Sequence, residues 1–157
     1  MEIIDNFLDK TEFEHIQKIM MGSDFPWYFS PHISTASDDK KLYYFEHSFF
    51  RFTRPTQYFE LWKGLLNKLK YKALIRAKAN LFLSAPTVQH HHFHTDYNYD
   101  HKTCLLYINT NNGPTTIGKK KIFPKANRAV FFNGSVKHRS SSCSDEQIRV
   151  TANFNYF

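Results

Sequence analysis

The first part of the chain shows apolar spacing typical of two helices. One helix is predicted from Thr11 to about Met21, because Thr11 and Glu14 have the spacing of a capping box. Three apolar residues recur on one face of it: Phe13, Ile16 and Met20. A second helix is expected after Pro55. Its apolar stripe consists of Tyr58, Leu61, Trp62, Leu65, Leu66 and Leu69.

After Tyr71 the apolar period changes from helical spacing to alternation. Apolar and polar residues alternate over Ile75–Leu83, which predicts a strand. A short strand is also expected at Ile3–Leu8, whereas the aromatic stretch Ser23–Thr53 shows no regular period. The remaining predicted strands are Val88–Asp96, Thr103–Asn109, Thr115–Ile117, Lys121–Phe123, Ala129–Phe132, Val136–Arg139 and Gln147–Asn155.

Two helices followed by a run of short strands are typical of an α+β protein whose β part is a barrel or jelly roll. We expect residues 1–157 to form a single domain, because the pattern contains neither an internal repeat nor a linker. The composition agrees with an ordered globule, since 17% of the residues are aromatic and glycine occurs only five times. Disordered and collagen-like chains are excluded.

Charge and cysteine content change this picture little. The net charge of +7 favours anionic partners in a general way, but the one dense basic run, Lys119–Lys121, fits a solvated hairpin better than a nucleic-acid patch. Cys104 and Cys143 have no metal-binding spacing, so we expect reduced packing residues. The first residues lack the cationic start and long apolar stretch of a signal peptide, which predicts a cytoplasmic protein without a membrane segment.

Histidines concentrate in the segment 89–101, which holds five of the nine. Residues two apart share one face of a strand, so His94 and Asp96 could bind one metal ion. His138 follows a later strand, and two histidines with one carboxylate form the facial triad of non-haem Fe(II) sites. Three protein ligands plus water are also a catalytic zinc arrangement, so the triad alone leaves both metals open. His90–His92 are not expected to be ligands.

Arg149 adds a second element to this candidate site. It lies 11 residues after His138 on the last predicted strand, and Thr151 shares its face. An arginine facing the interior is costly to bury unless it meets an anion, and its planar fork suits a carboxylate. The implied ligand is a dicarboxylate that chelates the metal at one end and reaches Arg149 at the other. An exposed or salt-bridged arginine is the alternative.

Taken together, these residues resemble a known signature. His94, Asp96, His138 and the pair Arg149 and Thr151 look like the HxD…H…R-x-S/T pattern of the 2-oxoglutarate- and Fe(II)-dependent dioxygenases. Within that superfamily the chain resembles the prolyl 4-hydroxylases, in the short stand-alone form found in bacteria and phages. The resemblance covers roughly the second half of the chain, and it points to the cytoplasm of a bacterium or of a phage-infected host.

The resemblance implies a fold and roles for particular residues. The implied fold is a double-stranded β-helix, or jelly roll, at about 73–157, supported by helices and a lid at about 1–72. The loop Pro26–Phe50 could close over the site or simply be a packed surface loop. The triad would bind Fe(II), Arg149 and Thr151 would bind 2-oxoglutarate, and a tyrosine of the strand after HxD would contact its distal carboxylate. That tyrosine is Tyr107.

The implied reaction couples the oxidative decarboxylation of 2-oxoglutarate by O2 to hydroxylation of a C–H bond, with ascorbate as an accessory reductant. A prolyl residue in a peptide or protein is the expected substrate. The chain differs from the animal enzymes at 82–86, where they carry a tyrosine, and at Asn155, where they carry a tryptophan. Nucleic-acid demethylases tend to have a second arginine at Asn155, which disfavours nucleic acid. Free amino acids and a non-catalytic cupin-like metal-binding module remain alternatives.

Overall fold

The computed structural model describes residues 1–33 and 43–157, and they form two antiparallel sheets with helices on one side. The helical elements are α1 (Lys10–Met20), the 3₁₀ helix η1 (Phe59–Trp62) and α2 (Lys63–Leu69). The strands are β1 (Glu2–Ile4), β2 (Tyr28–Ser30), β3 (Tyr44–Arg51), β4 (Arg54–Pro55), β5 (Leu74–Leu83), β6 (Lys102–Tyr107), β7 (Thr115–Ile117), β8 (Lys120–Ile122), β9 (Ala129–Asn133), β10 (His138–Arg139) and β11 (Ile148–Tyr156).

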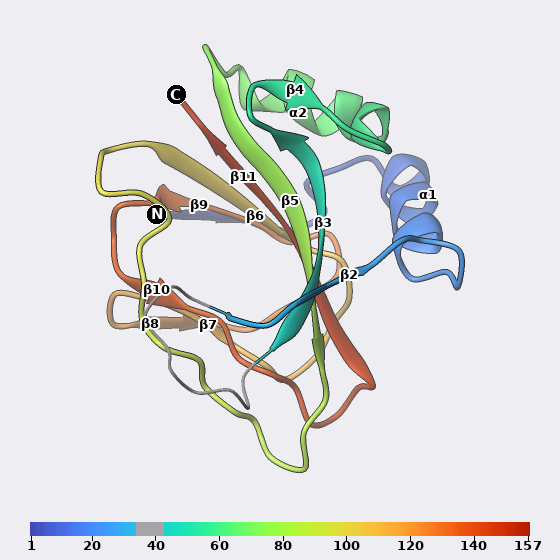
Figure 1. The fold of residues 1–157 in the computed structure, drawn as a ribbon, viewed down its shortest axis with the longest axis vertical. Helices are drawn as coiled ribbons and strands as arrows, with labels where there is room; N and C mark the ends of the chain where they lie inside the picture. The colour runs from blue at the N-terminus through green and yellow to red at the C-terminus, as the bar shows by residue number, and fades with distance from the viewer. Residues whose placement is uncertain (34–42) are drawn as a thin grey trace.

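The larger sheet has eight strands in the order β1-β9-β6-β11-β5-β3-β2, with β4 paired to β3. The smaller sheet has the order β10-β7-β8. Figure 1 shows α1 and α2 on the side of the larger sheet that faces away from the smaller one. This arrangement confirms the predicted α+β class with a jelly-roll core and supporting helices.

The main core lies between the helices and the outer face of the larger sheet. The three apolar residues that defined the stripe of α1 are all buried there. Trp62 is fully buried, and its ring centroid lies 5.1 Å from that of Phe49 and 5.0 Å from that of Phe154. A second apolar cluster lies between the two sheets: Leu105, Tyr107, Ile117, Ile122, Val130 and Phe132.

Strand β11 is buried on both faces, and this sets up the site. Its even-numbered residues from Val150 to Phe154 belong to the main core. Its odd-numbered residues lie on the opposite face, and Arg149, Thr151 and Asn153 line the space between the sheets. The neighbouring β5 also directs polar residues into that space, namely Arg76, Lys78 and Asn80. The interior between the sheets is therefore partly polar.

The helix starts differ from the predicted ones. Helix α1 begins at Lys10, and its N-cap residue Asp9 makes no side-chain capping hydrogen bond. The capping box expected from Thr11 and Glu14 is therefore wrong, because both residues already lie inside the helix. The second predicted helix begins as the tighter turn η1 and continues as α2, and Leu65 within it is fully buried.

The sequence suggested that the aromatic stretch Ser23–Thr53 is irregular, but it contains the two strands β2 and β3. Strand β3 pairs along β5, and its residues pack on both faces, which hides the alternation expected of a half-buried strand. The candidate lid Pro26–Phe50 is thus partly strand. Residues 34–42 of that lid lie outside the described residues.

The predicted strand Val88–Asp96 is also wrong. Two isolated bridges, His90 with Ser141 and His94 with His138, are its only pairings among the described residues. The backbone is therefore fixed at separate points, beside His138 of β10 and beside Ser141 after it, instead of along a continuous ladder. None of the described helices has the length and apolar character needed to cross a membrane. The cytoplasmic location stays a prediction.

Candidate active site

His94, Asp96 and His138 each bring one potential ligand atom to within 4.8 Å of the others. The backbones of His94 and His138 exchange two hydrogen bonds of 2.9 Å, which places the two rings side by side with their centroids 4.5 Å apart. Asp96 follows two residues later, and its Oδ2 lies 3.9 Å from His138 Nε2. The structure thus brings the predicted triad together without the continuous strand that the prediction used.

Backbone carbonyl groups fix the tautomer of both imidazoles. Nδ1 of His138 lies 2.8 Å from the carbonyl oxygen of Val136, and Nδ1 of His94 lies 3.3 Å from that of His92. A carbonyl oxygen can only accept, so Nδ1 carries the proton and Nε2 keeps a free lone pair. Burial, and then the neighbouring His138, lowers the pKa of His94, which favours the neutral form that binds metals.

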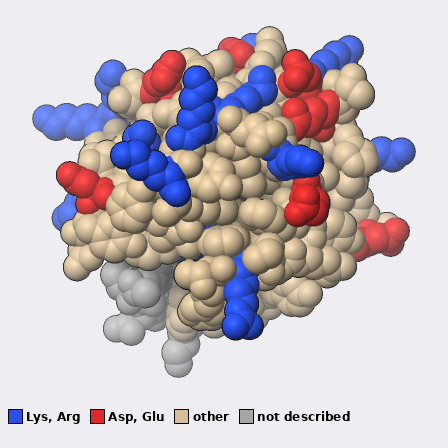
Figure 2. Space-filling view, turned by 90° about the horizontal axis from the view of Figure 1, so that it is seen from above, with Lys and Arg blue, Asp and Glu red and all other residues tan. Residues whose placement is uncertain are grey.

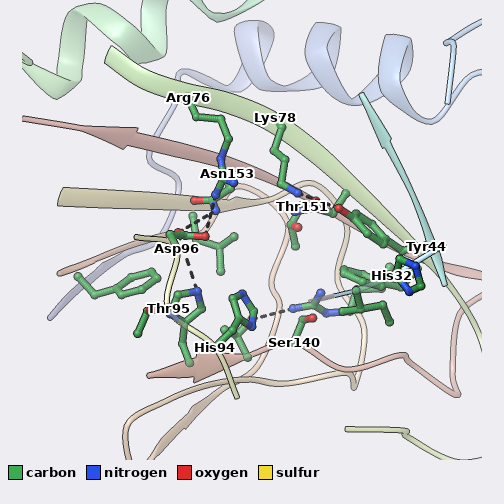
Figure 3. A pocket seen from close by; sticks show the side chains of 18 residues that line it. His32, Tyr44, Arg76, Lys78, His94, Thr95, Asp96, Ser140, Thr151 and Asn153 are labelled. Atoms are coloured by element: carbon green, nitrogen blue, oxygen red, sulfur yellow. Dashed lines mark hydrogen bonds and ion pairs between the residues drawn. The ribbon is translucent and has the colours of Figure 1, made fainter. Parts of the chain in front are cut away.

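The carboxylate of Asp96 is buried but remains ionised. Burial alone would raise its pKa, yet Arg76, His138 and a hydrogen bond from Asn155 outweigh burial and hold the pKa at about 2. Arg76 Nη2 donates a 2.7 Å hydrogen bond to Oδ1, and Asn155 Nδ2 donates one of 2.8 Å to Oδ2. Figure 3 shows Arg76 and Asn153 both directed at this carboxylate.

Arg149 is only 1% exposed, and its guanidinium makes two hydrogen bonds. Its Nε donates to the carbonyl oxygen of Gly113 at 2.9 Å, and its Nη2 donates to the hydroxyl of Thr115 at 2.7 Å. Its Nη1 is buried and has no hydrogen-bond partner among the described residues. A buried charged donor without a partner is costly, so the position suits an anionic ligand. Thr151, 2% exposed, lies on the same face of β11.

One cavity of about 630 Å³ contains both the triad and Arg149. A dicarboxylate could therefore touch both groups within a single space. The cavity is lined by His32, Ile33, Tyr44, Arg76, Lys78, Asn80, Phe82, His94, Thr95, Asp96, Leu105, Thr115, Phe132, His138, Ser140, Arg149, Thr151 and Asn153.

Tyr107 lies beside Arg149 but does not line this cavity. The guanidinium carbon of Arg149 is 5.8 Å from the centroid of the Tyr107 ring, and the tyrosine hydroxyl lies 3.5 Å from the carbonyl oxygen of Ile122. Burial raises the pKa of Tyr107, so the hydroxyl keeps its proton. The predicted contact between Tyr107 and the distal carboxylate stays a prediction.

Sequence reasoning missed the polar wall that β5 adds to the cavity. Arg76, Lys78 and Asn80 all line it. Lys78 Nζ donates to the hydroxyl of Tyr44 at 2.9 Å and lies 3.1 Å from a carboxylate oxygen of Glu46. The alternation of these polar residues was visible in the sequence. It did not reveal whether the polar face meets water or a cavity.

His91 is buried next to the site and is not a member of the triad. It is 4% exposed, and its Nδ1 lies 2.8 Å from the hydroxyl oxygen of Ser140, which lines the cavity. Burial, followed by the charge of Arg149, lowers the pKa of His91 from 6.5 to about 3. The folded protein therefore keeps this ring neutral at pH values where the unfolded chain protonates it.

The pKa of His91 predicts an acid-sensitive contribution to stability. Between pH 6.5 and about 3 the unfolded state binds the extra proton. The free energy of unfolding therefore falls on acidification through this window, by at most about 1.4 kcal/mol per pH unit from this group. Urea unfolding of the metal-free protein from pH 7 to pH 5 should show a shallower pH slope in His91→Gln than in the wild type. Equal slopes would contradict the assignment.

Comparison with known proteins gives a match only at the level of structure. No protein-family model and no curated sequence matches the chain, whereas many solved structures do. A prolyl hydroxylase from Trichoplax adhaerens, in complex with a hypoxia-inducible-factor oxygen degradation domain peptide, has a TM-score of 0.70 at 14% identity and covers 99% of this chain and 82% of its own.

Two further prolyl hydroxylase structures are also similar to this chain. The viral collagen prolyl hydroxylase of Paramecium Bursaria Chlorella virus-1, in a 2-oxoglutarate complex, has a TM-score of 0.62 at 16% identity, with coverage of 98% and 93%. A prolyl-4-hydroxylase from Pseudomonas putida has a TM-score of 0.64 at 13% identity, with coverage of 99% and 91%. As its sequence motif predicted, this chain has the double-stranded β-helix fold that these prolyl hydroxylases share.

Proposed function

We propose that this protein is an Fe(II)- and 2-oxoglutarate-dependent dioxygenase. The observation that carries the proposal is a single cavity that holds a His-Asp-His cluster and a buried guanidinium, whose Nη1 lacks a partner within residues 1–33 and 43–157. The donor set fits iron, because two imidazoles and one carboxylate supply three ligands and leave other coordination positions open. The viral enzyme of similar fold in a 2-oxoglutarate complex supports the choice of dicarboxylate.

The residues then divide into two groups. His94, Asp96 and His138 hold the metal, while Arg149 and Thr151 receive the distal carboxylate of 2-oxoglutarate. When bound, iron, 2-oxoglutarate and O2 supply the oxidising chemistry, which yields succinate, CO2 and a hydroxylated C–H position. The protein orients the two reactants and limits their contact with water, since half of the residues that line the cavity are buried. Ascorbate is proposed as an accessory reductant.

The charges around the cavity suit a dianionic ligand. Arg76 already compensates Asp96, and Lys78 is paired with Glu46. Arg149 makes no salt bridge to an acidic group among the described residues, because its two filled hydrogen bonds go to neutral oxygens. A metal dication and this guanidinium are thus left for the two carboxylates of 2-oxoglutarate.

A prolyl residue in a peptide or protein is the proposed substrate. Three proteins of similar fold are prolyl hydroxylases, and one of them is in complex with a peptide. Nucleic acid is not favoured, since Figure 2 shows Lys and Arg side chains interspersed with Asp and Glu across the face it displays. Free amino acids remain the alternative substrates for the same chemistry.

Two measurements test this function. Anaerobic addition of Fe(II) and 2-oxoglutarate should produce a weak visible charge-transfer band, and zinc in place of iron should give none. In air, the iron-loaded protein should convert proline-containing peptides to products with one added oxygen atom and release succinate. Products on lysine or asparagine alone would overturn the prolyl assignment. Absence of both the band and succinate would refute the dioxygenase.

A further inference from the structure

A buried set of hydrogen bonds connects Asp96 to three strands of the larger sheet. Asn155 of β11 lies at its centre and has no exposed surface. Arg76 Nε donates to its Oδ1 at 3.1 Å. Its Nδ2 lies 2.8 Å from Asp96 Oδ2, 3.2 Å from His101 Nε2 and 3.0 Å from Thr103 Oγ1. Every polar atom of this amide therefore has a partner.

The neighbours of Asn155 allow only one orientation of its amide. Arg76 Nε can only donate, so the atom that faces it must be the amide oxygen, and the NH2 group then faces Asp96. His101 Nδ1 lies 2.9 Å from the carbonyl oxygen of Tyr99 and must carry the proton. His101 Nε2 and Thr103 Oγ1 can then both accept from the second amide hydrogen.

The two oxygens of Asp96 are held by different residues. Oδ1 accepts from Arg76 Nη2 at 2.7 Å, and Oδ2 accepts from Asn155. Arg76 is itself fixed, because its guanidinium also lies 5.4 Å from the centroid of the Tyr97 ring. Oδ2 is the oxygen that lies 3.9 Å from His138 Nε2. The carboxylate cannot rotate without breaking one of these bonds.

Gly134 belongs to the same arrangement. Its carbonyl oxygen accepts from the backbone N–H of Asp96 at 3.2 Å, and its own N–H donates to the carbonyl oxygen of His101 at 3.0 Å. A Cβ at this position would overlap His101 Nε2 and Thr103 Oγ1. The glycine therefore permits a close approach, and this turn leads directly into His138.

We propose that Asn155, together with Arg76, is a positioning residue that fixes the orientation of Asp96 for metal binding. Outer partners of a ligating carboxylate typically change metal affinity by about 10–100-fold when they are lost. The inference rests on the proposed function for the site of the metal, but its test uses binding alone and needs no turnover.

The test compares two asparagine-to-leucine variants by calorimetric titration of the full chain with Mn(II). Asn155→Leu should bind Mn(II) about 10–100-fold more weakly than the wild type. Asn80→Leu is the matched control, because Asn80 lines the same cavity without a hydrogen bond to Asp96. The control should keep the wild-type affinity. The visible spectrum of bound Co(II) should change in Asn155→Leu only, since that spectrum reports the geometry of the ligands.

Thr103→Val provides a second reading should Asn155→Leu fail to fold. It removes one acceptor of the Asn155 amide without touching Asp96, so a smaller loss of Mn(II) affinity is expected. Wild-type affinity in every variant that folds would overturn the positioning role while leaving the proposed function intact. A wild-type protein that binds no Mn(II) would instead refute the metal centre, and the positioning role with it.

Discussion

Arg149→Ala is expected to weaken 2-oxoglutarate binding by about 2–5 kcal/mol, roughly 30-fold to several thousand-fold, with metal affinity unchanged. The guanidinium is 1% exposed and its Nη1 has no partner among the described residues, so a carboxylate placed there is desolvated and pairs with a full charge. The measurement is the charge-transfer band of the iron-loaded protein during anaerobic titration with 2-oxoglutarate.

Lys78→Ala is the matched control for this prediction. Lys78 lines the same cavity, but its ammonium already pairs with Glu46, so its removal should leave the affinity for 2-oxoglutarate close to that of the wild type. If Lys78→Ala lost affinity for 2-oxoglutarate and Arg149→Ala did not, the distal carboxylate would bind Lys78 and the assignment to Arg149 would be wrong. Arg149 also bonds Gly113 and Thr115, so thermal unfolding must show that the alanine variant is folded.

The strands that the sequence predicted well are those with clear alternation. In β5 the small apolar residues Ala77 and Ala79 face the helices and the polar ones face the cavity, which gives a period of two. Strand β11 could be predicted for a different reason, since its apolar and polar residues alternate although both faces are buried. Burial of polar residues is possible there because the cavity and its hydrogen bonds receive them.

The segments that the sequence predicted wrongly have one feature in common: their structure depends on pairing with residues that lie far away in the chain. Strand β3 carries aromatic and polar residues on both faces, so no period marks it. The segment Val88–Asp96 is rich in polar residues, and its path is set by bridges to His138 and Ser141 instead of by its own pattern. Local periodicity contains no information about either partner.

The same distinction applies to the residues of the candidate site. The triad and Arg149 could be predicted from the sequence, because their residue types and spacing reflect coordination chemistry. Arg76 and Asn155 could not be assigned to the site from the sequence, because they are neighbours only through the register of β5 on β11. Asn155 was visible in the sequence only as a difference from related enzymes, the animal prolyl hydroxylases and the nucleic-acid demethylases. Its bond to Asp96 required the three-dimensional arrangement.

Alanine at Asp96 or His138 is expected to remove the stabilisation that a bound metal gives the protein. A ligand that binds only the folded state raises the free energy of unfolding by about 2.7 kcal/mol when its concentration is 100 times Kd. Wild-type protein should therefore unfold at a higher temperature with Mn(II) than without it. Each alanine variant should show no such shift, because two remaining ligands hold the ion too weakly at the same concentration.

His92→Ala separates loss of a ligand from loss of a nearby histidine. His92 is exposed and its contact with the triad is through its backbone carbonyl oxygen, which the substitution keeps. The variant should retain the full Mn(II)-dependent rise in unfolding temperature. If His92→Ala lost the rise while His138→Ala kept it, the metal would bind in the exposed histidine run. In that case no metal ion would lie in the cavity beside Arg149, and one dicarboxylate could not contact both the metal and Arg149.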